Sequence, residues 1–266
     1  MPPPLVDADP TGDGPEFHSL RASAEHLEGI IDRLDNFVPH PRTSLVGDDA
    51  ATALDVFSFQ IRGLLSTATD NLRGVALMVV DADALPVFAG YTLLRNALEC
   101  AGLSLWLLGP RSRNERVIRS LQLSYESKRD CRVLASEFDG TPHIPLEPGD
   151  DEYDRLLALR DARPALSTRS LRPPSITNRL TASQTFVTSP GPAHALVTYW
   201  RLASGVTHGR RDVIWRVTNA HIESWTELGA VTVMTADIAL LTETFDAALS
   251  YLANALDLLE TRNTPR

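Results

Sequence analysis

Apolar residues recur at three- and four-residue spacing along most of the chain, which is the pattern of amphipathic helices. The pattern predicts helices over residues 16–37, 48–83, 87–108, 112–138, 151–163 and 235–261, and another from about 189 to 209. The acidic pair Asp48-Asp49 suits the first turn of the second of these helices. Period-two alternation is nearly absent, although residues 213–215 and 231–233 fit either short strands or irregular chain. We therefore expect an all-α bundle of about six or seven helices.

The segment 87–108 is the most apolar of the chain and is long enough to cross a bilayer. Arg95 and Glu99 lie in its middle, where ionised side chains are costly in a membrane. We therefore expect a central buried helix and no membrane partner. Arg95 and Glu99 are four residues apart and can pair directly. The pair fits two roles equally well: a buried ion pair that fixes helix register, or support for a basic group on a neighbouring helix.

Composition sets the limits of the domain. The 266 residues are 43% hydrophobic and 22% charged, which is enough to bury one sizeable core. Residues 1–15 are rich in Pro, Asp and Gly and are expected to be a disordered lead without the features of a secretion signal. Residues 16–262 are expected to form one helical domain. Cys100 and Cys131 do not form a CxxC pair, which is typical of a reduced, cytoplasmic protein.

One window of the chain is basic although the whole protein is acidic. Residues 162–211 contain seven arginines and no acidic residue, so the window carries +7 and the rest of the chain, from a total of −9, carries −16. Its first part, residues 161–191, is rich in Arg, Pro and Ser and is expected to be a long irregular loop. A local basic strip indicates an anionic ligand such as nucleic acid. The alternative is that these arginines pack against the acidic remainder of the fold. The candidates for nucleic-acid binding are Arg163, Arg169, Arg172, Arg179, Arg210 and Arg211.

The stretch from Tyr199 to Gly209 holds the candidate chemistry. Arg201, Ser204 and His208 stand at positions i, i+3 and i+7, so on a helix they share one face over about 10 Å. His194 extends the same stripe by one heptad, and Gly209 is expected to end the helix in a left-handed conformation.

These residue types suit metal-independent cleavage of RNA. His208 titrates in the range needed to take a proton from a 2′-hydroxyl. Arg201 has the bidentate geometry that stabilises a charged phosphorane, and Ser204 would orient His208 or bind phosphate. No residues here have metal-ligand spacing, so we expect no metal and no cofactor. The alternative is that Arg201 and His208 are buried and hydrogen-bonded within the fold, with Glu99 as a partner.

The motif also resembles a known family. Arg201 followed by six residues and His208 matches the Arg-x(4–6)-His signature of the HEPN superfamily of small helical bundles. The ending His208-Gly209 and the upstream pair Arg95 and Glu99 are similar to larger bacterial proteins grouped near that superfamily. Leu202 departs from the pattern, because a polar residue usually follows the arginine.

The resemblance implies a function and a set of partners. Active members of the superfamily are metal-independent ribonucleases, often dimers, that serve as toxins or in phage defence. It therefore implies RNA as substrate, a homodimer and a neutralising partner protein. The alternative is a non-catalytic bundle that binds nucleotide, RNA or a protein.

Overall fold

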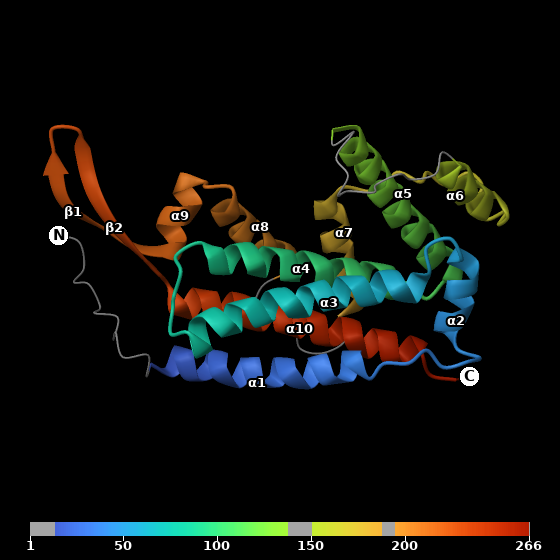
Figure 1. Ribbon diagram of the computed structural model, residues 1–266, viewed down its shortest axis with the longest axis horizontal. Coiled ribbons are helices and arrows are strands. Elements are labelled where there is room, and N and C mark those ends of the chain that lie inside the picture. Colours follow the sequence, from blue (N-terminus) through green and yellow to red (C-terminus); the bar gives the residue numbers. More distant parts are fainter. Residues whose placement is uncertain (1–13, 138–150, 188–194, 266) are drawn as a thin grey trace.

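The computed structural model describes residues 14–137, 151–187 and 195–265 and shows a helical bundle with one hairpin (Figure 1). Within these ranges the helices are α1 (Pro15–Asp35), α2 (Ser44–Asp49), α3 (Phe57–Ala76), α4 (Ala89–Leu108), α5 (Arg113–Glu137), α6 (Glu152–Asp161), α7 (Ile176–Ser183), α8 (Leu196–Thr207), α9 (Arg211–Val217) and α10 (Ile238–Arg262). Strands β1 (Thr218–Thr226) and β2 (Gly229–Ala236) pair antiparallel. The predicted fold class is confirmed, with more helices than expected.

Helix α4 is the centre of the bundle. It packs against α3 and α10 on one side and against α7 and α8 on the other (Figure 1). Its side chains from Ala97 to Leu108 are almost all buried, which confirms the central position expected for residues 87–108. In the described part of the chain, no helix has the length and apolar character needed to span a membrane.

Helix α1 covers the opposite side of α3 and α10. Leu20, Leu27, Ile30 and Leu34 form its buried stripe, the spacing expected of an amphipathic helix on a core. At the surface, Arg33 bridges to two acidic side chains of α10. The bundle is thus layered as α1, then α3 with α10, then α4, then α7 with α8.

The prediction of one helix over 48–83 is wrong. Asp48 and Asp49 end α2 instead of opening the long helix, which begins only at Phe57. Asp49 still caps that helix from outside, because its carboxylate accepts hydrogen bonds from the backbone N–H and the hydroxyl of Ser58 at 2.7 and 2.9 Å. After Ala76, α3 passes into a π-helical turn.

Two further expectations also need correction. Residues 161–191 are not irregular throughout, because α7 lies within them with the Ser175 hydroxyl as its N-cap. Residues 213–215 are helical, in α9, whereas 231–233 do lie in a strand, β2. Three expectations fall outside the described residues. They concern His194, residues 189–194 at the expected start of the motif helix, and residues 1–13 of the expected lead.

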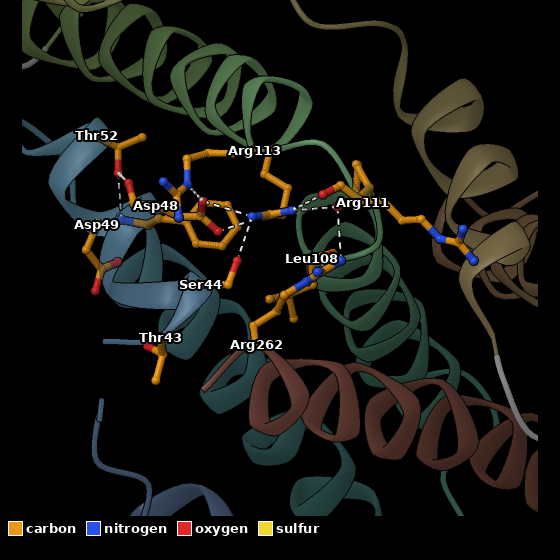
Figure 2. A network of polar contacts seen from close by, with 12 residues as sticks. Thr43, Ser44, Asp48, Asp49, Thr52, Leu108, Arg111, Arg113 and Arg262 are labelled. Carbon is orange, nitrogen blue, oxygen red and sulfur yellow. Dashed lines mark hydrogen bonds and ion pairs between the residues drawn. The ribbon is translucent and has the colours of Figure 1, made fainter. Parts of the chain in front are cut away.

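A buried polar network ties α2 to the turn between α4 and α5 (Figure 2). The Asp48 carboxylate is fully buried and accepts from Arg116 Nε at 2.7 Å, from Arg116 Nη2 at 3.0 Å and from Arg113 Nε at 3.1 Å. Arg116, 2% exposed, also donates to the Ser44 hydroxyl and to the carbonyl oxygen of Pro110. The buried ion pair of Asp48 and Arg116 is therefore surrounded by further hydrogen bonds, which offset the cost of burying the two charges.

Arg262, at the end of α10, binds the same turn. Its guanidinium donates to the carbonyl oxygens of Leu108, Gly109 and Pro110. Cations are favourable at a helix C-terminus, where carbonyl groups lack partners within the helix. Two arginines from distant parts of the chain thus hold the C-terminal end of the central helix.

Candidate functional site

Helix α8 carries the candidate motif and is oriented by two aromatic side chains. The Tyr199 hydroxyl donates to Glu243 of α10 at 2.7 Å, and Trp200 Nε1 donates to Glu99 of α4 at 2.9 Å. Both rings are buried, as is Ala203 one turn further on. Because this face of the helix is fixed on the core, the opposite face, which carries Arg201, turns outward.

Two glycines shape the end of the motif. Gly209 has a φ of +65°, and its N–H and that of Arg210 bond to the carbonyl oxygens of Val206 and Gly205, which is a Schellman turn. The expected left-handed end is therefore confirmed. A Cβ on Gly205 would lie 2.8 Å from a methyl carbon of Val213, so glycine lets α9 pack closely against α8. Gly209 and Gly205 are thus explained by the helix end and by the packing of α9 on α8.

Arg201 and His208 are exposed and Ser204 is half-buried. Among the described residues, none of these three side chains has a hydrogen bond or ion pair. The interpretation that Arg201 and His208 are buried and satisfied in the core is therefore wrong. The structure leaves a guanidinium, a hydroxyl and an imidazole free on the surface of α8.

The pair Arg95 and Glu99 faces α8, as the supporting role requires. Their closest nitrogen–oxygen distance is 3.1 Å, and the side chains are 28% and 24% exposed. The Arg95 guanidinium also stacks 5.6 Å from the centre of the Trp200 ring. The partner on α8 is thus Trp200, and Glu99 makes no hydrogen bond to Arg201 or His208. The pair positions the motif helix without touching the candidate chemistry.

Two arginines of the basic window are used within the fold. Arg169 donates to both carboxylate oxygens of Glu115, at 2.6 and 3.4 Å, and this bonding lowers the pKa of Glu115. Arg179 is buried and donates to both oxygens of Glu126, at 2.7 and 3.1 Å. Both carboxylates belong to α5. For this pair of arginines, the alternative of packing against the acidic remainder is correct.

The other arginines of the window have no acidic partner within the described ranges. Arg210 and Arg211 are exposed and follow Gly209 at the start of α9, so they lie close to His208 in the chain. Arg163 is half-buried, and Arg172 is exposed in the segment before α7. The arginines of the basic window therefore do not form one surface. Of the candidates for nucleic-acid binding, only Arg210 and Arg211 are close in the chain to the candidate motif.

Sequence reasoning missed a cleft between α4, α5 and the segment that leads into α7. The cleft has a volume of about 710 Å³, a size typical of small-molecule sites. Its lining includes Glu99, Leu103, Leu123, Glu126, Arg172, Pro173, Pro174, Ile176 and Arg179. Arg201, Ser204 and His208 are not part of it. Three segments far apart in sequence form this cleft, so no local motif could have indicated it.

No family model, curated protein or solved structure matches the chain. The HEPN-like relationship thus stays a prediction from the motif. Among the described residues, no group of three His, Cys, Asp or Glu side chains could hold a metal ion.

Proposed function

We propose that the free face of α8 and the turn after it bind the phosphate backbone of RNA. The observation that carries this proposal is that Arg201, His208, Arg210 and Arg211 are all exposed and unpaired within the described residues. Other arginines of the same window, such as Arg169, are engaged by carboxylates. A run of free cationic donors on a protein of net charge −9 gives a local attraction for polyanions.

The spacing suits this ligand. Arg201 and His208 are seven residues apart, about 10 Å along the helix axis, and both side chains point away from the core. A guanidinium binds phosphate oxygens in a bidentate manner, while imidazole supplies a shorter donor. Contacts of this kind fix the position of the strand and carry little information about its sequence.

Metal-independent cleavage of the bound strand is the second candidate function. It is favoured by one observation, which is that the His208 ring is free while Ser204 and Arg201 lie on the same helix face. His208 would accept the 2′-hydroxyl proton and Arg201 would stabilise the phosphorane. The toxin or phage-defence role and a neutralising partner protein would follow only from such an activity.

Binding is tested by fluorescence anisotropy with labelled single-stranded RNA over a series of salt concentrations. We expect Arg201→Ala, and separately Arg210→Ala with Arg211→Ala, to weaken binding. Each lost phosphate contact should reduce the salt slope by about 0.7 for a single strand. The matched control is Arg62→Ala, because Arg62 is exposed on α3, away from this face. Equal affinities for the control and the α8 variants would overturn the proposal.

Cleavage is tested by incubating the protein with RNA in the presence of EDTA. If α8 is catalytic, His208→Ala and Arg201→Ala each abolish cleavage, and the double variant is no worse, because groups that act as a unit are not additive. Circular dichroism confirms that the variants remain folded. Binding without cleavage leaves the protein as an RNA-binding module.

A further inference from the structure

The cleft between α4, α5 and the segment that leads into α7 is lined by both apolar and charged side chains. Leu103 of α4, Leu123 of α5 and Ile176 of α7 supply aliphatic groups, and each of them also packs in the main core. The charged side chains come from the same two long helices and from residues 172–179. A volume of about 710 Å³ with this mixture of groups is typical of a site for a small molecule.

The carboxylates that line the cleft are all bound by arginines. These pairs are Glu99 with Arg95 at 3.1 Å, Glu126 with Arg179 at 2.7 Å and Asp130 with Arg129 at 2.8 Å. Arg172 also lines the cleft, and its exposed guanidinium has no hydrogen bond or ion pair among the described residues. Because the other charges cancel in pairs, the cleft carries one uncompensated positive charge.

Arg179 adds a second group with a donor left over. The residue is 5% exposed and lines the cleft from α7. Its two Nη atoms donate to Glu126, whereas its Nε is buried and has no hydrogen-bond partner in the described part of the chain. A buried donor without an acceptor is unfavourable. The guanidinium groups of the cleft therefore match a ligand that supplies acceptor oxygens.

The backbone that carries Arg172 is fixed on both sides. Leu171 is 5% exposed and packs in a second apolar cluster with residues of α5. The side-chain amide of Gln122 donates to the carbonyl oxygen of Ser170 at 2.8 Å. After Arg172, the pair Pro173-Pro174 restricts the chain because each ring fixes φ. Little backbone order thus has to be gained when a ligand binds, which favours affinity.

The first turn of α7 belongs to the same cleft, since Ser175 and Ile176 are part of its lining. The Ser175 hydroxyl accepts from the N–H of Asn178. The N–H groups of Ile176 and Thr177 have no hydrogen bond within the described ranges. Free N–H groups at a helix N-terminus favour an anion. They therefore add to the positive charge of Arg172.

We propose that this cleft binds a small molecule that carries a carboxylate or a phosphate on an apolar body. The anionic oxygens accept from Arg172 and from the first turn of α7, while the body packs against Leu103, Leu123 and Ile176. Arg172 then serves this ligand and not nucleic acid. The free face of α8 is not part of the cleft, so the proposal does not depend on RNA binding.

The test is a titration of the full chain, followed through its amide signals by NMR, with four probes that share a phenyl ring. Phenylacetate and phenyl phosphate are anionic, 2-phenylethanol is neutral and 2-phenylethylamine is cationic. We expect one or both anions to bind about tenfold more tightly than the neutral probe, as a charge-assisted hydrogen bond allows. The tighter anion identifies the group that the cleft prefers. The amide signals of Leu123 and Ile176 should shift on binding.

Substitutions of Arg172 test the role of its charge. Arg172→Ala should remove the preference for anions and leave the affinity for 2-phenylethanol unchanged, and Arg172→Glu should make the amine the tightest probe. The matched control is Arg155→Ala, because Arg155 is exposed on α6 and does not line the cleft. This variant should bind every probe as the wild type does.

Three results would overturn the proposal. The first is that no probe shifts the signals of the cleft, and the second is that the neutral probe binds the wild type as tightly as the anions do. The third is a preference for anions that persists in Arg172→Ala. Because Arg172 is exposed, the variants should stay folded, and circular dichroism checks this.

Discussion

Replacing Asp48 with alanine tests the buried network that joins α2 to the start of α5 (Figure 2). Asp48 has no exposed surface and its partner Arg116 is 2% exposed. Alanine therefore leaves a buried guanidinium without its counter-charge, a change that costs about 3–5 kcal/mol. Arg116 keeps its bonds to Ser44 and to the carbonyl oxygens of Pro110 and Arg111. We therefore expect the lower end of this range, about 3 kcal/mol.

The assay is urea unfolding followed by circular dichroism, with an unchanged slope as the sign of two-state behaviour. For a domain of this size, the same loss corresponds to a fall in Tm of about 6–12 °C. Arg113→Ala is the matched control. Arg113 binds the same carboxylate, but its side chain is 50% exposed, so the expected loss is below about 1 kcal/mol.

A double variant separates charge burial from packing. Asp48→Leu with Arg116→Met replaces the pair by apolar side chains, a change that is often neutral in buried sites. It should recover most of the stability that Asp48→Ala loses. The reasoning is refuted if Asp48→Ala stays within about 1 kcal/mol of the wild type, or if the double variant is less stable than Asp48→Ala.

Three further substitutions probe other parts of the bundle. Glu99→Ala removes the acceptor of Trp200 Nε1 and the ion pair at a half-buried position, so it should lower the free energy of unfolding by about 1.5 kcal/mol; an unchanged urea midpoint would show that the pair does not hold α8. Tyr91→Phe removes a buried hydroxyl that has no partner among the described residues and should raise Tm by the equivalent of about 1 kcal/mol; a lower Tm would mean that the hydroxyl is bonded. Burial raises the pKa of Asp246, so the stability that this group contributes is full below its ordinary pKa of about 3.9 and is lost as pH rises through the raised value. Asp246→Asn keeps an acceptor for the Ser23 hydroxyl, so its Tm should exceed that of the wild type at neutral pH and equal it below that ordinary pKa; a pH-independent difference would contradict this account.

Most helices could be predicted because their apolar spacing continues from end to end. The expected range 235–261 differs from α10 by at most three residues at either end. The second predicted helix failed because apolar spacing continues across residues 50–56, where the chain turns. Two contacts decide that turn: one from Asp49 to Ser58, nine residues further on, and a long-range one from Asp48 to the arginines of α5. An acidic pair such as Asp48-Asp49 can begin a helix, end one or cap one from outside. The sequence alone does not decide between these positions, and the tertiary contacts do.

The candidate site was predicted in part. Spacing alone placed Arg201 and His208 on one helix, and the need of Arg95 and Glu99 for a partner placed them against it. Their actual partner is Trp200. The sequence pattern shows it only as one of the apolar residues of the helix, so its role as a partner could not be predicted. The cleft and the Asp48 network join segments far apart in the chain and leave no local pattern.

Two smaller elements did leave a local signal. For α7, the signal is Ser175 as a cap before Ile176 and Leu180. For the hairpin, it is Gly229 at a turn before the β-branched residues of β2. Both signals lie in segments whose polar composition favoured irregular chain.

The position of α10 in the bundle has a consequence for synthesis. Helix α4 is completed in the middle of the chain, but one of its principal contact surfaces belongs to α10, and α1 rests on the same helix. The apolar surface of α4 therefore stays open on a nascent chain until more than a hundred further residues have been translated. Closing the bundle must wait for these distant contacts, which slows folding. A ribosome-bound chain that stops before α10 would present its most apolar helix to chaperones.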